Sequence, residues 1–274
     1  MSQTFPRNTN VSVDEVEQHL RSLNIHKAPG PDALPTWILR DFSTVLAGPV
    51  AAIYNSSLRE GHVPEVWRSA FVSPLAKKHP PEQVEKDLRP ISLTPILCKE
   101  MEDFIVKWVW ELVLDEVDPN QYGSVKGSST THALVDILHQ CYTCTDASKQ
   151  FARILLLDYS KAFDLINHSL LLKKLEQFQL PNVLLKWITS FLLHRKQQVR
   201  FQQVESSWNH IHGGVPQGTK LGPVLFVLMI NDLQTVTHTN MLMIPVLSLS
   251  DQTHKLQTFK MQPTPLTHGP KQMT

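Results

Sequence analysis

The sequence predicts an α+β fold in which amphipathic helices pack against short strands. In several stretches, apolar residues recur at intervals of three and four, as they do along one face of a helix. Other short runs are wholly apolar, or alternate between apolar and polar residues, and are bounded by Pro and Gly, which is typical of strands. The chain has 274 residues, of which 42% are hydrophobic and 19% charged, so it can bury a core of ordinary globular composition.

The N-terminal part is predicted to hold helices and one pair of strands. Ser12 and Glu15 have the spacing of a capping box, which predicts a helix whose buried face holds Val13, Val16, Leu20 and Leu23. Gly61 is expected to end one or two buried helices, because glycine commonly follows the last turn of a helix. Two short strands joined by a polar loop are predicted within 69–95, and a further helix over 99–117.

The C-terminal part follows the same patterns. The apolar run 152–159 predicts a strand buried on both faces. Alternation over 197–208 predicts an antiparallel strand, and 213–233 is expected to form a tight turn that leads into a helix. Beyond Asp251 the chain is polar and contains several prolines, which predicts disorder. Amphipathic helices are predicted over 131–145, 168–178 and 182–193.

Charge, cysteine content and hydropathy predict where the protein resides. The net charge is +1, so any nucleic-acid site must be a local feature of the surface. Three cysteines are too few for a disulfide scaffold, and the N-terminus has no apolar leader. The longest apolar stretch, "LGPVLFVLMI", is too short to span a bilayer. We therefore expect an intracellular protein of the nucleus or cytoplasm, neither secreted nor in contact with a membrane.

The chain contains residues of the kinds that bind phosphate groups and the metal ions that accompany them. Asp158 ends an apolar strand, a position that holds a metal-binding carboxylate rigidly, although a turn or capping Asp has the same pattern. An aromatic side chain, Phe163, follows five residues later. The segment "GGVPQG" lets backbone approach a ligand closely, and its Gln217 both donates and accepts hydrogen bonds; it could equally be a simple turn. Together with upstream cations, the set suggests a phosphate-bearing substrate, the cations being Lys77, Lys78 and Arg89.

Five segments, in this order, resemble the reverse transcriptase of non-LTR (LINE-type) retrotransposons. They are "KAPGPD", "LRPISLTP", "QYGSVKGSSTTHAL", "LLLDYSKAFDLINH" and "GGVPQGTKLGPVLFVLMINDL". The resemblance covers 11–233, and it is specific because independent blocks agree. It implies a fingers–palm polymerase fold, with an antiparallel palm sheet packed on helices. It also implies RNA-directed DNA polymerisation, with an RNA template, a DNA primer and a dNTP as partners.

The resemblance assigns roles to individual residues. Asp158 and the backbone carbonyl of Tyr159 would hold Mg²⁺, of which the intact family uses two ions. Phe163 would stack under the deoxyribose and exclude a 2′-OH, and Asp164 would cap the turn or the next helix. The incoming triphosphate would pair with Arg89 and with Lys77 or Lys78, whereas the nucleotide and template pocket would be lined by Gln217 and Gly218.

The family's second pair of carboxylates, from an aromatic-x-Asp-Asp hairpin after "INDL", has no counterpart, since 239–250 contain no acidic residue. The residues 239–244 can be encoded as ACA AAT ATG TTG ATG ATA, and the same letters read from the third base encode Lys-Tyr-Val-Asp-Asp. We therefore expect a frameshift between Leu233 and Asn240. The predicted organisation is a linker remnant over 1–10, fingers and palm over 11–233, and an out-of-frame, disordered tail over 234–274, with an incomplete palm and no thumb.

One carboxylate cannot anchor two divalent ions, so the sequence predicts an inactive polymerase domain. An alternative is a non-enzymatic remnant that still binds RNA or DNA. A third possibility is a phosphotransferase with Asp158 as nucleophile, but such enzymes use a second Asp two residues later, where this chain has Ser160.

Overall fold

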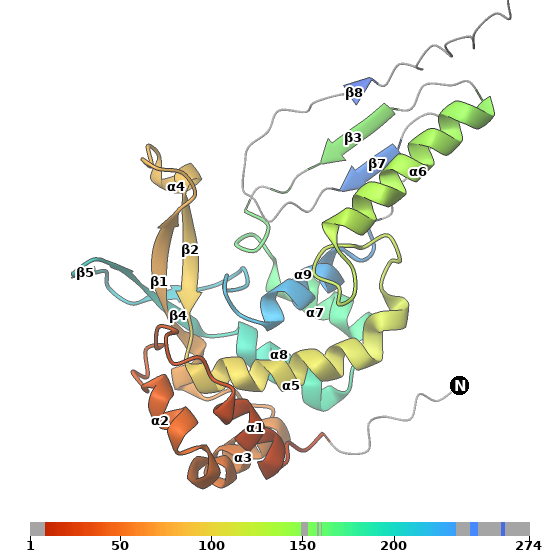
Figure 1. The fold of residues 1–274 in the computed structure, drawn as a ribbon. Coiled ribbons are helices and arrows are strands. Elements are labelled where there is room, and N and C mark those ends of the chain that lie inside the picture. The colour runs from red at the N-terminus through yellow and green to blue at the C-terminus, as the bar shows by residue number, and fades with distance from the viewer. Residues whose placement is uncertain are drawn as a thin grey trace, which may run out of the picture. The chain divides into compact units, whose positions relative to one another are not determined.

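The computed structural model describes residues 9–148, 153–157, 159, 161–233, 242–245 and 259–260 (Figure 1). The chain forms two compact units. The first unit comprises Met1–Asp118 and Lys161–Asn231, and the second comprises Pro119–Ser160 and Asp232–Thr274. Helices and mixed sheets are both present, which confirms the α+β class.

The helices of the first unit begin and end largely where local signals place them. Ser12 Oγ accepts from the backbone N–H of Glu15 (3.2 Å) and Glu15 Oε2 accepts from the N–H of Ser12 (3.1 Å), so the capping box is confirmed. Gly61, with φ +61°, ends α3. The helices are α1 (Val13–Arg21), α2 (Thr36–Asp41), α3 (Ser43–Glu60), α4 (Val84–Asp87), α5 (Ile96–Val113), α7 (His168–Gln177), α8 (Asn182–Leu192) and α9 (Leu221–Ile230), with short 3-10 segments η1 (Glu65–Arg68) and η2 (Leu114–Glu116).

The core of the first unit lies among these helices. Trp187 of α8 is fully buried and donates from Nε1 to Ser57 Oγ (3.0 Å), and Tyr54 donates from its hydroxyl to the carbonyl of Leu97 (2.8 Å). The predicted apolar face of α1 is correct for Val16 and Leu20, but Val13 is 48% exposed because it is the first residue of the helix. Within the described part of the chain, no helix is long and apolar enough to cross a membrane.

The sheet of the first unit has the strand order β2–β1–β4–β5, and β6 pairs with β4. The predicted antiparallel strand pair is confirmed as β1 (Ser69–Ala76) and β2 (Leu88–Leu93), with α4 at its tip (Figure 1). The predicted single strand over 197–208 is wrong. The chain turns at Gln202 (φ +56°), so this stretch forms a hairpin, and its first strand also pairs with β1 in parallel. The strands of this region are β4 (Arg195–Phe201), β5 (Val204–Glu205) and β6 (Asn209–Ile211).

The second unit contains α6 (Thr130–Ser148) and the three-stranded sheet β7–β3–β8. The predicted strand is confirmed as β3 (Arg153–Leu157), where Ile154 is half-buried; its other side chains lie outside the described ones. β7 (Leu242–Pro245) runs parallel to β3, which contradicts the expected antiparallel sheet, and β8 (Phe259–Lys260) runs antiparallel. A long crossover separates β3 from β7, and such a connection permits parallel pairing whereas a hairpin does not. The short strands β7 and β8 fall within 234–274, the tail that is predicted to be disordered.

Candidate nucleotide and nucleic-acid site

The β1–β2 ribbon carries the predicted triphosphate-binding cations. Leu75 pairs with Arg89, and the N–H of Lys77 donates to the carbonyl of Asp87 (2.8 Å), which extends the ladder by one pair. Directly paired residues share a face and side chains alternate along a strand, so Lys77 lies on the same face as Arg89. The Nε of Arg89 is buried and makes no hydrogen bond within the described protein. A buried donor of this kind could serve an anion.

Lys78 is engaged at the tip of the ribbon. Its Nζ lies 3.3 Å from Glu82 Oε2 and 3.4 Å from Asp87 Oδ2. The hydrogen bond to Glu82, followed by the charge of Asp87, raises the pKa of Lys78. Because strand alternation places Lys77, and not Lys78, on the face of Arg89, the register favours Lys77 as the partner of Arg89.

The "GGVPQG" loop joins two of the predicted site segments. Its Gly214 and Val215 donate backbone hydrogen bonds (both 2.8 Å) to the carbonyls of Ile166 and Phe163, respectively. Gly214 has φ +77°, and a Cβ there would lie 2.7 Å from the carbonyl oxygen of Asp164. Glycine is therefore required at this contact with the turn that carries Phe163.

The same loop also docks on β2. The carbonyl of Gln217 accepts from the N–H of Ser92 (2.7 Å). Gly218, with φ +102°, approaches this strand so closely that a Cβ would lie 3.0 Å from the carbonyl oxygen of Ser92. Because β2 is an edge strand, its outward N–H groups are available for such pairing. The loop thus connects the strand that carries Arg89 with the turn that carries Phe163.

Phe163 and Asp164 face different partners in this turn. The ring of Phe163 is half-buried against Phe226 of α9, with centroids 5.3 Å apart and planes tilted by 36°. Asp164 Oδ1 accepts from Gln217 Nε2 (3.2 Å), and of the two expected roles, capping the turn or the next helix, the second is wrong. Asn167 caps α7 instead, because it precedes the first helical residue and its Oδ1 accepts from the N–H of Leu170 (3.0 Å).

The predicted metal-binding residues belong to the second unit, whereas the other site residues belong to the first. Asp158, which follows β3 directly, lies outside the described residues. Tyr159 is 40% exposed. The strand that pairs with the end of β3 is apolar, with Pro245 opposite Leu157.

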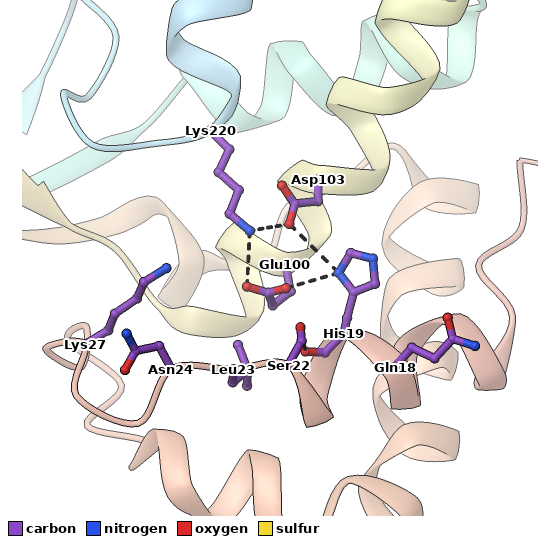
Figure 2. Close-up of a pocket in the computed structure, with 9 residues that line it drawn as sticks. All are labelled: Gln18, His19, Ser22, Leu23, Asn24, Lys27, Glu100, Asp103 and Lys220. Carbon is purple, nitrogen blue, oxygen red and sulfur yellow. Dashed lines mark hydrogen bonds and ion pairs between the residues drawn. The ribbon is translucent and has the colours of Figure 1, made fainter. Parts of the chain in front are cut away.

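A second cluster, which sequence reasoning missed, surrounds a cavity of about 380 Å³ in the first unit (Figure 2). His19 Nδ1 lies 3.1 Å from Glu100 Oε2 and 3.9 Å from Asp103 Oδ2. Lys220 Nζ lies 3.2 Å from Glu100 Oε1 and is also ion-paired with Asp103. Lys27, from the "KAPGPD" segment, lines the same cavity. Burial raises the pKa of Glu100, but hydrogen bonds and charges from His19 and Lys220 outweigh it and lower this pKa overall.

The three potential ligand atoms of His19, Glu100 and Asp103 lie within 4.8 Å of one another, as a metal site requires. The ammonium of Lys220 already pairs with both carboxylates, however, and it supplies the positive charge that a cation would bring. The cluster is therefore an ion network that ties α1 and α5 to the start of α9. Glu100 and Asp103 are three residues apart on one helix, but nothing in the sequence indicates that His19 and Lys220 would join them.

Glu102 was also missed, and it holds the start of α9. Its side chain is fully buried, and Oε2 accepts from the N–H groups of Lys220 (2.7 Å) and Leu221 (3.0 Å). N–H groups at the N-terminus of a helix have no acceptor within the helix, so the carboxylate of Glu102 on α5 caps α9. Burial raises the pKa of Glu102, and the hydrogen bond from Leu221 opposes the rise.

Comparison with known proteins shows the family to which the chain belongs. The family described as "Reverse transcriptase (RNA-dependent DNA polymerase)" matches residues 76–254. The chain is 31% identical over 221 residues to "Probable RNA-directed DNA polymerase from transposon X-element" of Drosophila melanogaster, covering 80% of this chain and 24% of that protein. It is 31% identical over 229 residues to "RNA-directed DNA polymerase from mobile element jockey" of the same species, covering 83% and 25%.

A third relative is "Retrovirus-related Pol polyprotein from type-1 retrotransposable element R1" of Bradysia coprophila, 27% identical over 232 residues, which cover 83% of this chain and 22% of that protein. The chain thus spans about a quarter of the length of the curated relatives it matches. The resemblance read from the five segments is confirmed: the chain belongs to the reverse transcriptase (RNA-dependent DNA polymerase) family.

Proposed function

We propose that this chain is a retrotransposon-derived reverse transcriptase domain that keeps nucleotide and template contacts but has lost polymerase catalysis. The observation that carries the binding part is the "GGVPQG" loop, which is hydrogen-bonded both to Ser92 of β2 and to the carbonyl of Phe163. Three segments that the family uses for one nucleotide are thereby held together in the first unit. The substrates would be a template–primer duplex and a dNTP.

The proposed nucleotide contacts follow from the described side chains. Arg89 has an unpartnered buried Nε and shares its face with Lys77, so this pair suits a triphosphate. Phe163, backed by Phe226, offers a fixed ring for the sugar. Gln217 and Gly218 would line the base pocket, where the absence of a side chain at Gly218 leaves its backbone accessible.

The proposed ligands of Mg²⁺ are the Asp158 carboxylate and the Tyr159 carbonyl. This donor set does not fit the pair of ions that nucleotidyl transfer needs, because two ions require several anionic oxygens. The strand next to β3 supplies only Leu242, Met243, Ile244 and Pro245, none of which carries a carboxylate. We therefore infer that the palm is incomplete. The frameshift and the boundary at Leu233 remain predictions.

The test measures incorporation and binding separately in the full chain. Template-primed dNTP incorporation is assayed with Mg²⁺ and with Mn²⁺, for the wild type and for Asp158→Asn. Duplex binding is then measured as a function of salt. We expect binding that weakens with salt and no incorporation above that of Asp158→Asn. Incorporation by the wild type that Asp158→Asn abolishes would overturn the proposed loss of catalysis, and failure to bind any nucleic acid would overturn the binding part.

A further inference from the structure

One face of the β2–β1–β4 sheet carries cations and an aromatic ring beyond the proposed nucleotide site. Phe71 is paired with Leu93 of β2 and with Gln198 of β4. Directly paired residues share a face, and every second residue along a strand returns to it. Arg89 lies four pairs along the ladder from Phe71 and Leu93, an even number, so it shares this face with Lys196 and Arg200 of β4. We call it the open face.

The charged side chains of β4 on the open face are accessible to a ligand. On the opposite face, Ala70, Val72 and Arg195 are 2%, 5% and 1% exposed, so this part of that face packs on the core, whereas Val199 and Phe201, nearer the β4–β5 turn, are 40% and 56% exposed. On the open face, Ser69 and Phe71 are 4% and 8% exposed, but the side chains of Lys196 and Arg200 beside them are 35% and 45% exposed.

Trp208, just before β6, forms the centre of the open face. Its ring lies 5.7 Å from that of Phe71, centroid to centroid, with a tilt of 37°. Lys196 Nζ lies 5.8 Å from the centroid of Trp208, and Arg200 Cζ lies 3.2 Å from the centroid of Phe71. Trp208 nevertheless stays 40% exposed. An exposed indole flanked by two cations is the combination that stacks a base and neutralises its phosphates.

Charge favours a polyanion as the occupant. Arg89, Lys196 and Arg200 lie on this face. The acidic partners of the last two are Glu65 (3.2 Å from Lys196) and Glu205 (2.8 Å from Arg200), whose side chains are 76% and 48% exposed. Surface pairs of this kind are worth at most about 1 kcal/mol each, so phosphates can compete for both cations.

We propose that the open face binds a single-stranded segment of nucleic acid, with a base stacked on Trp208 and phosphates at Lys196 and Arg200. The strand would continue from the nucleotide site, because Arg89 lies on the same face. This inference rests on the proposed binding of nucleic acid by the domain. It adds a contact surface formed by Phe71, Trp208, Lys196 and Arg200, next to the predicted site residue Arg89.

The test uses fluorescence anisotropy with the full chain and labelled 20-nucleotide oligo(U) and oligo(dT) over a salt series. Trp208→Ala should weaken binding of either probe by about 5- to 150-fold, since stacking one base contributes about 1–3 kcal/mol. The double variant Lys196→Gln/Arg200→Gln should reduce the slope of log K against log[salt] by about 1.4, because each phosphate contact to a single strand contributes about 0.7. The cation variant keeps Trp208, so it also tests the surface if Trp208→Ala fails to fold.

Phe201→Ala is the matched control, since Phe201 is a 56% exposed aromatic of the same hairpin that alternation places on the opposite face. It should bind like the wild type. The proposal is overturned if the wild type binds but neither open-face variant changes affinity or salt slope, or if Phe201→Ala weakens binding as much as Trp208→Ala. It is also overturned if Trp208→Ala changes only the oligomeric state in light scattering, which would make the face a protein interface. A wild type that binds no oligonucleotide overturns the proposed function as well.

Discussion

Replacing Glu102 should reveal how a buried carboxylate holds the start of α9. Glu102→Ala leaves the N–H groups of Lys220 and Leu221 without an acceptor in a fully buried place. An unsatisfied buried group costs about 1–3 kcal/mol, so the variant should lose about 2–6 kcal/mol of unfolding free energy. Glu102→Gln keeps one oxygen that can accept both bonds and should lose much less.

The pH dependence gives a sharper test. Burial raises the pKa of Glu102 above its ordinary value of 4.5, so the folded state binds more protons than the unfolded state just above that pH. The contribution of Glu102 to stability should therefore decline as pH rises from 4.5 through the folded-state pKa. Urea unfolding of the wild type and of Glu102→Gln across this range measures the difference directly. A constant difference across the range, or a Glu102→Ala variant as stable as the wild type, would refute the reasoning.

Three further outcomes follow from the same geometry. Gly214→Ala should destabilise the protein in urea unfolding by more than Gly127→Ala, because both have positive φ but only Gly214 has a backbone oxygen 2.7 Å from the new Cβ; equal losses would contradict this. Glu100→Gln should be less stable than the wild type at pH 7, and the deficit should shrink as pH falls below 4.5, since the lowered pKa of Glu100 stabilises only above that value; a deficit that is constant in acid would be inconsistent. Lys77→Gln should weaken dNTP binding in equilibrium titration by about tenfold, because one charged contact is lost, whereas Lys78→Gln should leave the affinity unchanged. A larger loss for Lys78→Gln than for Lys77→Gln would show that strand register does not select the cation.

Local signals in the sequence predicted several features that depend on near neighbours. The capping box of Ser12 and Glu15, the glycine that ends α3 and the β1–β2 ribbon all depend on residues a few positions apart. The glycines and Gln217 of the "GGVPQG" loop are recognisable from the segment itself, and the family resemblance implies a role for Gln217 and Gly218. Their actual contacts, with Asp164 and Ser92, could not be anticipated, because those partners lie on other segments.

Pairings between distant segments account for several of the errors, whereas the turn at Gln202 and the cap of α7 are local features that the sequence reading missed. The parallel pairing of β4 with β1 joins residues more than a hundred positions apart, and the alternation over 197–208 carries no information about it. Lys220 likewise meets Glu100 and Asp103 from more than a hundred positions away. Glu102 has the pattern of a solvated charge on a helix, yet it is fully buried, because the start of α9 supplies its hydrogen-bond donors.

The hydrogen bonds that hold the "GGVPQG" loop and the residue just after it determine how much order a ligand would have to create on binding. Ser92 holds Gln217 from one side, the turn of Phe163 holds Val215 from another, and Glu102 fixes Lys220 just downstream. A segment restrained in this way has little conformational freedom left to lose, so a nucleotide would meet a preorganised surface and its arrival would order little. The free protein would then already protect the amides of Gly214 and Val215 from hydrogen exchange, long before any substrate is added.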